Sequence, residues 1–340
     1  MTTTLVTGAT GFIAGHVIEE LLTHGYRVRS TVRSLRDPSR TAHLRDLADR
    51  TGGDVELVEA DLLHDDGWAA AVDGCDNVLH VASPFPPAPP KDASELVRPA
   101  VEGTLRVLRA SEVAGVRRVV VTSSVAAITG GRPKGDDRVR DESDWTDEDQ
   151  AAPYALSKTL AEQAAWRFAD DHPSLEVVAL NPGMVLGPLQ NAAAGTSVAT
   201  VRRFLGREVP AVPAMSLATI DVRDLAHAQR RALEVPHAAG NRYVCAGPDL
   251  PMLEMAQMLH EEFGPLGYRV PTARLPYWAM WLIARVDGEV RFGLDYVDRP
   301  ERLDASKAGA ALGLTMRPVR ESVVDTARSL IEHGLVRPRG

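Results

Sequence analysis

Short apolar runs alternate with amphipathic stretches over the first half of the chain. The runs are typical of buried strands and fall at residues 5–6, 26–32, 55–59, 77–81, 119–121 and 176–180. Between them, apolar residues that recur every three or four positions predict helices, including one from Phe12 onward and one over residues 93–114. The residues expected on the buried side of the second are Val97, Val101, Leu105, Leu108 and Val113. This alternation predicts an α/β fold with a Rossmann-type, doubly wound parallel sheet.

The alternation is lost after Pro188, where helices are predicted at residues 198–205, 253–263 and 319–331. We therefore expect a dinucleotide-binding Rossmann domain over residues 1–188 and a smaller, mixed substrate lobe over residues 189–340, with the chain crossing back around 219–246. An apolar run over residues 275–284 contains Trp278 and Trp281 and is expected to form a helix that faces the core or a pocket. This run is far too short to span a bilayer.

A glycine turn follows the first predicted strand. Gly8 and Gly11 let the backbone turn sharply and approach a ligand, and the helix that begins at Phe12 presents free N–H groups that suit a phosphate. The spacing G-x-x-G-x-x-A, with a strand before it and a helix after it, predicts a dinucleotide site rather than an ordinary tight turn. Thr10 and Ile13 belong to the same predicted cofactor-binding segment as these three residues.

The end of the second predicted strand favours NADP(H) over NAD. An NAD-binding chain usually carries Asp or Glu there for the ribose 2′-hydroxyl, whereas this chain has Arg33, then Arg36 and Arg40, with no carboxylate before Asp37. Guanidinium groups bind a 2′-phosphate through charge-assisted hydrogen bonds, and we assign this role to Arg33 and Arg40. The alternative is a solvated arginine cluster on a surface turn.

The next strand ends supply further candidate cofactor contacts, because ligands of an open parallel sheet lie beyond the carboxyl ends of its strands. Asp61 is a candidate acceptor for the adenine amino group, with Leu62 covering the ring. Asp is also a common helix N-cap, and the two roles are compatible. Val81, together with the small residues Ala82 and Ser83, is expected to pass beneath the cofactor.

The residues that carry chemistry are Tyr154 and Lys158, which share one face of a helix at positions i and i+4. A phenol has a pKa of roughly 10, so it is a useful acid or base near neutral pH only when its anion is stabilised, as an ammonium one turn away does. Ser124 ends the polar pair that follows a strand and is a second site candidate, although a serine there can also be a simple cap. The alternative for the Tyr–Lys pair is an amphipathic helix with a packed tyrosine and a solvated lysine.

The sixth predicted strand is followed by Pro182 and Gly183, which exclude a regular helix and lay the backbone flat. Such a segment, continued by Val185, suits main-chain contacts to the carboxamide of nicotinamide. A plain loop is the alternative.

Net charge and cysteine content limit the classes of binding partner and the cellular compartment that we expect. The formal net charge of −8 and the lack of a basic block argue against nucleic acid. The two cysteines, Cys75 and Cys245, have no metal-ligand spacing and fit a reducing compartment, so we expect no metal and a cytoplasmic location. The N-terminus enters a strand at once, which predicts no signal peptide and no membrane partner.

With these motifs in place, the chain resembles an extended short-chain dehydrogenase/reductase of the dihydroflavonol reductase, cinnamoyl-CoA reductase and microbial aldehyde/ketone reductase group. The segments that carry the resemblance are Val6-Thr7-Gly8-Ala9-Thr10-Gly11-Phe12-Ile13-Ala14, Thr31-Val32-Arg33, Ala60-Asp61-Leu62, His80-Val81-Ala82-Ser83-Pro84, Thr122-Ser123-Ser124, Tyr154 with Lys158, Asn181-Pro182-Gly183 and Asp221-Val222-Arg223-Asp224. The resemblance implies Tyr154 as proton donor to a carbonyl oxygen, Ser124 rather than Ser123 as its hydrogen-bonding partner, and Lys158 as modulator. It also implies a substrate bound between two lobes, and homodimers are common in related enzymes.

Two segments are candidates for the substrate pocket. Pro84 and Phe85 begin a proline-rich, extended loop that could wall a cleft. Met184 and Met215 would make the pocket between the lobes apolar, although each is individually expected in a core.

These observations predict an NADPH-dependent reductase that converts an aldehyde or ketone to an alcohol with a Ser-Tyr-Lys set. The alternatives are a hydroxysteroid-type dehydrogenase, a nucleotide-sugar epimerase or dehydratase on the same scaffold, and a non-catalytic NADP sensor. The sequence leaves open which carbonyl compound is the substrate, the stereochemistry and the physiological direction.

Overall fold

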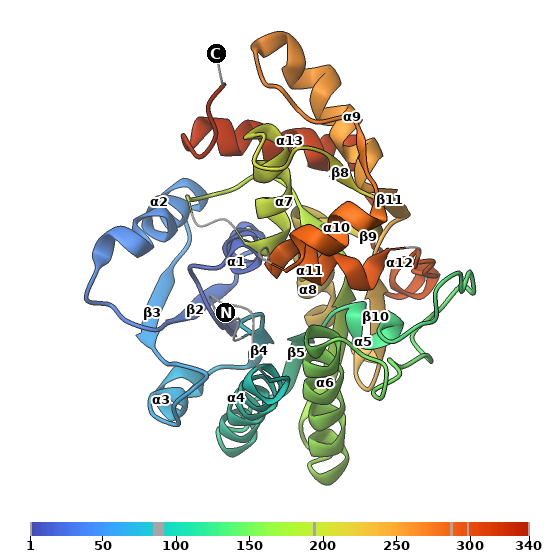
Figure 1. Cartoon of the computed structure of the whole chain (residues 1–340). Helices are drawn as coiled ribbons and strands as arrows, with labels where there is room; N and C mark the ends of the chain where they lie inside the picture. The colour runs from blue at the N-terminus through green and yellow to red at the C-terminus, as the bar shows by residue number, and fades with distance from the viewer. Residues whose placement is uncertain (1, 84–91, 193–194, 286–287, 298, 339–340) are drawn as a thin grey trace.

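The computed structural model describes residues 2–83, 92–192, 195–285, 288–297 and 299–338 (Figure 1). Its centre is a parallel sheet with the strand order β10-β6-β5-β4-β1-β2-β3. The strands are β1 (Thr3–Val6), β2 (Arg27–Val32), β3 (Val55–Glu59), β4 (Asn77–His80), β5 (Arg118–Thr122), β6 (Glu176–Pro182) and β10 (Arg242–Cys245). The order reverses between β1 and β4, and ligands of such sheets bind beyond the strand ends at this switch point.

Helices cover both faces of the sheet, so the predicted Rossmann-type fold is confirmed (Figure 1). One apolar core joins the sheet to α1 (Phe12–Thr23), α2 (Ala42–Thr51), α8 (Val222–Glu234) and α12 (Ser306–Leu312). The core on the other face joins it to α3 (Trp68–Val72), α4 (Ser94–Val113) and α6 (Pro153–Asp171). The short helices α5 (Ala126–Thr129), η1 (Pro38–Thr41) and η2 (Pro236–Ala238) lie in the connections.

The buried face of α4 differs from the expected one. Val113 is 85% exposed, and the other expected positions except Leu108 are only half-buried. Ala100 and Gly103 are buried instead, and a Cβ on Gly103 would lie 3.1 Å from the Cβ of Leu62. The helix therefore approaches its neighbours through small residues, which a pattern of large apolar residues does not register.

The second lobe is built on a small sheet of β7 (Met184–Leu186), β9 (Ser216–Asp221) and β11 (Asp249–Pro251). Its core is closed by α7 (Thr196–Leu205), α9 (Met252–Phe263) and α13 (Val319–Glu332), and η3 (Gly264–Leu266) and the pair β8 (Val212–Pro213) and β12 (Arg274–Leu275) complete it. Between β9 and β11 the chain returns to the large sheet, where α8 packs on α1 and β10 pairs with β6. The domain division at residue 188 stays a prediction.

The aromatic helix α10 (Tyr277–Ile283) does not place its tryptophans in a core. Trp278 is 67% exposed and Trp281 is 48% exposed, whereas Met280 is fully buried, so the expectation of core packing is wrong for both tryptophans. The helix is short and buries only one side, next to α11 (Gly288–Gly293) and η4 (Leu294–Tyr296). The guanidinium of Arg285 lies over the Trp281 ring, 3.9 Å from its centroid. Among the described residues, no helix combines the length and apolarity needed to cross a membrane.

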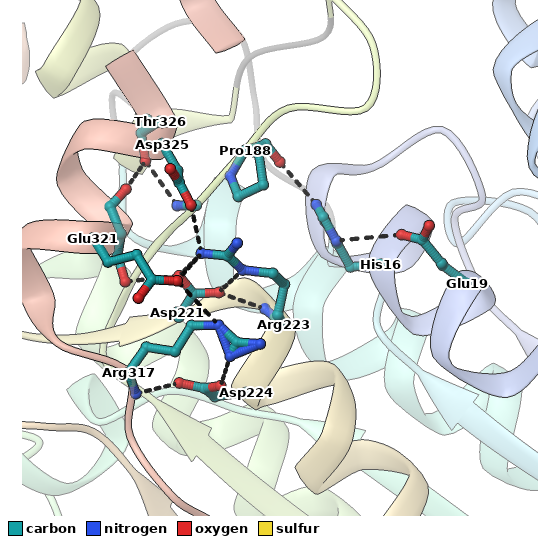
Figure 2. A network of polar contacts seen from close by, with 12 residues as sticks. His16, Glu19, Pro188, Asp221, Arg223, Asp224, Arg317, Glu321, Asp325 and Thr326 are labelled. Atoms are coloured by element: carbon teal, nitrogen blue, oxygen red, sulfur yellow. Dashed lines mark hydrogen bonds and ion pairs between the residues drawn. The ribbon is translucent and has the colours of Figure 1, made fainter. Parts of the chain in front are cut away.

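A polar network joins the two lobes (Figure 2). Asp221 ends β9 and caps α8 by accepting the N–H of Arg223 at 2.8 Å. The Arg223 guanidinium donates to Asp221 and to Asp325 of α13 at 2.8 and 2.9 Å, and Ser322 of α13 donates to Asp221 at 2.7 Å. The last helix is thereby held against the segment that returns to the large sheet.

Candidate functional site

The glycine turn after β1 has the geometry of a phosphate site. Gly8 has a φ of +77°, and a Cβ there would lie 2.9 Å from the Cβ of Ala82, so the turn and β4 approach closely only because Gly8 has no side chain. Its N–H donates to Thr31 Oγ1 at 2.9 Å, which fixes the turn against β2. Gly11 is the N-cap of α1, and no side chain of the described residues caps that helix. Its first N–H groups are therefore suited to an anionic ligand.

The other residues predicted to bind the cofactor in this segment lie in the turn and in the first turn of α1. Thr10 is half-buried and Gly11 is exposed in the turn, and Phe12 and Ile13 open α1 and are half-buried. Ala9 donates its N–H to Thr31 O at 2.8 Å, so the turn stays next to the end of β2.

The arginines after β2 are exposed and uncommitted. Arg33 directly follows the last residue of β2, and Arg36 and Arg40 follow in the connection to α2. None of the three side chains forms an ion pair within the described parts of the chain. A strand end beside the glycine turn with free guanidinium groups fits a 2′-phosphate.

The next strand ends give a mixed result. Asp61 Oδ1 accepts the N–H of Leu63 at 3.0 Å within a turn, but the next helix, α3, has Gly67 as its N-cap, so the helix-capping alternative for Asp61 is wrong. Leu62 is only 8% exposed and packs in the core with α3 and α4, which leaves little of it to cover a ring. Val81 and Ala82 are half-buried and Ser83 is exposed at the end of β4. Pro84 and Phe85 lie outside the described residues.

The structure brings Ser124 and Tyr154 together. Tyr154 lies in the first turn of α6, and the Ser124 hydroxyl after β5 hydrogen-bonds with its phenol. The preceding Ser123 donates instead to the Glu162 carboxylate and so has a different partner. Lys158 lies one turn along α6 from Tyr154, as the spacing predicted.

Burial opposes the charged forms of both α6 groups. It raises the pKa of Tyr154, which the hydrogen bond from Ser124 counteracts and the carboxylate of Glu301 reinforces. Burial also lowers the pKa of Lys158 to about 8, against the effect of the nearby Glu162. Lys158 therefore stays an ammonium at neutral pH and is poised to lose its proton in mildly alkaline solution.

The Pro182–Gly183 segment is more regular than a loop. β6 continues through Pro182, and β7 begins at Met184. A Cβ on Gly183 would lie 2.3 Å from Ala218 O, so the two strands can follow one another beside β9 only with glycine between them. Val185 is buried, and Met184 is half-buried. Met215 is also half-buried, against Gly293 of α11.

Three buried polar residues near the site, Glu162, Asn181 and Arg242, were not among the predicted site residues. Glu162 accepts hydrogen bonds from Asn181 and Arg242, and Asn181 also donates to Ser124 O at 3.2 Å. The available signal was the i+4 spacing of Glu162 after Lys158. The contribution of Arg242 depends on the pairing of β10 with β6 and could not be read locally.

Comparisons with known proteins identify the family of the chain. The model of the NAD dependent epimerase/dehydratase family matches residues 4–246. Cinnamoyl-CoA reductase 1 of Arabidopsis thaliana is 34% identical over 342 residues, covering 99% of this chain and 91% of that protein. The rice cinnamoyl-CoA reductase 1 is 39% identical over 264 residues, covering 76% and 75%. The solved yeast methylglyoxal/isovaleraldehyde reductase Gre2, complexed with NADPH, matches with a TM-score of 0.79 at 26% identity, covering 98% and 100%. The chain therefore belongs to the NAD dependent epimerase/dehydratase family and is an oxidoreductase of the extended short-chain dehydrogenase/reductase type.

Proposed function

We propose that this protein is an NADPH-dependent reductase that converts an aldehyde or ketone to an alcohol. The hydrogen bond between Ser124 and Tyr154, with Lys158 one turn away, carries the proposal. Related proteins support it, because two are named for reducing cinnamoyl-CoA and one for reducing methylglyoxal and isovaleraldehyde, all of which contain a reducible carbonyl.

The preference for NADPH rests on the end of β2. Arg33 there is exposed and unpaired among the described residues, as a 2′-phosphate requires. The yeast neighbour was solved with NADPH. The glycine turn and the uncapped α1 would hold the pyrophosphate, and the segment from Pro182 to Val185 would face the nicotinamide.

The chain's own residues supply the acid and the polarising groups. The cofactor, when bound, supplies the hydride that reduces the carbonyl carbon. Tyr154 donates its phenolic proton to the carbonyl oxygen, and Ser124 donates a hydrogen bond to the same oxygen as its negative charge develops. Lys158, as an ammonium, lowers the cost of the phenolate that Tyr154 becomes.

The first experiment follows the loss of reduced nicotinamide absorbance with a panel of aldehydes, aryl ketones, β-keto esters and dihydroflavonols, with NADH in parallel. We expect turnover with NADPH, and Tyr154→Phe should lower kcat by about 100-fold or more while NADPH affinity is largely retained. Tyr26→Phe is a matched control, because its hydroxyl bonds Glu234 far from Ser124. Turnover by Tyr154→Phe at the wild-type rate would refute the mechanism. No turnover of any carbonyl despite NADPH binding would favour an oxidative, nucleotide-sugar or sensing role.

A further inference from the structure

Glu162 continues the face of α6 that carries Tyr154 and Lys158. The three residues follow one another at intervals of four, so their side chains lie along one side of the helix. Glu162 is only 1% exposed, although glutamate is rarely buried unless it is paired. It has no part in the chemistry proposed above.

The Glu162 carboxylate is held on both oxygens. Oε1 accepts hydrogen bonds from Arg242 Nε and, at 3.2 Å, from Trp166 Nε1. Oε2 accepts from Ser123 Oγ and, at 2.7 Å, from Asn181 Nδ2. All of these partners donate, which suits an ionised carboxylate rather than a carboxylic acid.

Arg242 is in turn fixed behind Glu162. Its guanidinium donates to Glu142 O and Asp144 O at 2.9 and 2.8 Å, and it lies over the Trp145 ring at 3.7 Å from the centroid. Arg242 is 7% exposed, and these contacts hold its charge next to Glu162. The Arg242 cation therefore neutralises part of the Glu162 charge permanently.

Lys158 and Glu162 share a small cavity rather than a direct contact. Both line it, together with His80, Thr104 and Ser123, and their charged atoms are not within ion-pair distance of each other. A charge across such a cavity acts through a medium of low dielectric constant, where its effect over several ångströms is much stronger than in water.

We propose that Glu162 is the counter-charge that keeps Lys158 protonated, and that Arg242 limits how strongly it does so. Glu162 and Arg242 are thus positioning residues that act on Tyr154 through Lys158. The effect of the Glu162 charge on Lys158 follows from the structure. Its consequence for turnover rests on the proposed reductase function.

Glu162 carries the only carboxylate among the described residues that line the cavity. The other charged or titratable groups near Lys158 come from several elements. From α6 Lys158 faces Tyr154 and Glu162, and from β4 it faces His80. Burial and the Lys158 charge lower the pKa of His80 to about 3, so this imidazole is neutral. The α4 and β5 sides contribute uncharged groups, and Arg242 lies behind Glu162.

The sign of the effect follows from these charges. Burial lowers the pKa of Lys158 to about 8 while Glu162 opposes the fall. Removing the Glu162 charge should lower the pKa of Lys158 further, by about one unit for a charge several ångströms away. Removing the Arg242 charge should raise it, because Glu162 then acts unopposed.

The chain offers a direct measurement because it has only four lysines, Lys91, Lys134, Lys158 and Lys307. A pH titration of ¹³C-lysine-labelled protein, followed by NMR without cofactor or substrate, resolves the Lys158 ammonium, with Lys158→Met to assign the signal. We expect the Lys158 midpoint to fall by about one pH unit or more in Glu162→Gln and to rise in Arg242→Gln. Glu176→Gln is the matched control. It breaks an ion pair with buried Arg118 at the start of β6, whereas Asn181, the β6 partner of Glu162, lies near the end of that strand. The Lys158 midpoint should therefore stay unchanged.

The outcomes separate the two proposals. An unchanged Lys158 midpoint in folded Glu162→Gln, or shifts of the same sign in both variants, would overturn the inference. If Glu162→Gln does not fold, the direction of the shift in Arg242→Gln decides. In an active enzyme, the alkaline limb of the kcat/KM profile should move with the NMR midpoint. Inactive wild-type protein with the expected NMR shifts would instead refute only the reductase function.

Discussion

Ser123 and Ser124 are adjacent in the chain, yet the structure gives them different partners. Ser123 donates to Glu162, whereas Ser124 bonds to Tyr154. The spacing of Tyr154 and Lys158 is local, so a pattern along one helix was enough to predict that they share a face. Which of the two serines contacts Tyr154 depends on how the segment after β5 packs against α6. No local sequence pattern determines this packing. Glu162 has a local signal in its i+4 spacing after Lys158, but its partners Asn181 and Arg242 come from other strands, so its role was missed.

The two serines therefore make a matched pair of variants. Ser124→Ala should lower kcat with a carbonyl substrate by about 10- to 100-fold, because a hydrogen bond to the developing oxyanion is lost. Ser123→Ala leaves Tyr154 its partner and removes only one of the five hydrogen bonds to Glu162, so kcat should fall by less than about threefold. Steady-state kinetics with NADPH measures both. A larger loss in Ser123→Ala than in Ser124→Ala would reverse the assignment.

Arg33 carries the prediction on cofactor choice. In Arg33→Asp the charge-assisted hydrogen bonds to a 2′-phosphate are replaced by repulsion, so NADPH affinity should fall by about tenfold or more while NADH binding changes little. Fluorescence titration with each cofactor measures the ratio. Arg109→Asp makes the same charge change on exposed α4 and controls for net charge. An unchanged NADPH preference would move the phosphate site to Arg36 or Arg40.

Helices and strands were easiest to predict where one local sequence pattern was enough to indicate them. The strand, glycine turn and helix at the N-terminus match the structure, as does β3. The predictions failed where packing is made by small residues, as in α4, or where an apolar helix buries one narrow side, as in α10. β7 was missed because a strand of three residues after a Pro–Gly pair depends on β9, more than thirty residues later.

The glycine turn can be tested as an element by comparing Gly8→Ala with Gly25→Ala. Both glycines have a φ of +77°, but a Cβ at Gly25 meets nothing within 4 Å, whereas one at Gly8 meets Ala82 at 2.9 Å. Gly25→Ala should cost about 1–2 kcal/mol of unfolding free energy from backbone strain alone. Gly8→Ala should cost more and also weaken NADPH binding, because the turn must move away from β4. Urea unfolding and cofactor titration measure the two effects, and equal losses in both variants would show that the contact with Ala82 is unimportant.

At the scale of the whole molecule, the fold class followed from the alternation of strands and helices, but the joining of the lobes did not. The contacts between α8 and α13 link residues about one hundred positions apart. The sequence shows Asp221 and Arg223 as part of a motif, and only the structure shows that Ser322 and Asp325 complete their network. Asp325 is labelled in Figure 2. This network holds α13 of the second lobe against Asp221 and Arg223, where the chain returns to the large sheet.

Asp221 is the residue through which this junction should respond to acid. Burial works against its ionised form, yet hydrogen bonds from Arg223 and Ser322 hold the pKa of its carboxyl below the usual value. A carboxyl with a lowered folded-state pKa stabilises the protein above its unfolded pKa of about 3.9, and this contribution is lost as pH falls through the folded value. Asp221→Asn should therefore lower the unfolding free energy by about 2 kcal/mol at pH 7, because Arg223 loses one of its carboxylate partners and keeps Asp325. The difference from wild type should shrink below about pH 4.

Urea unfolding at several pH values measures this difference. Glu261→Gln is the matched control, because its ion pair with Arg320 is exposed and should contribute less than about 1 kcal/mol. The Asp221 contribution depends on ionisation, so a difference between Asp221→Asn and wild type that stays constant from neutral to acid pH would contradict it. The loss would then come from packing or from the helix cap, and the charge of Asp221 would have no part in holding the two lobes together.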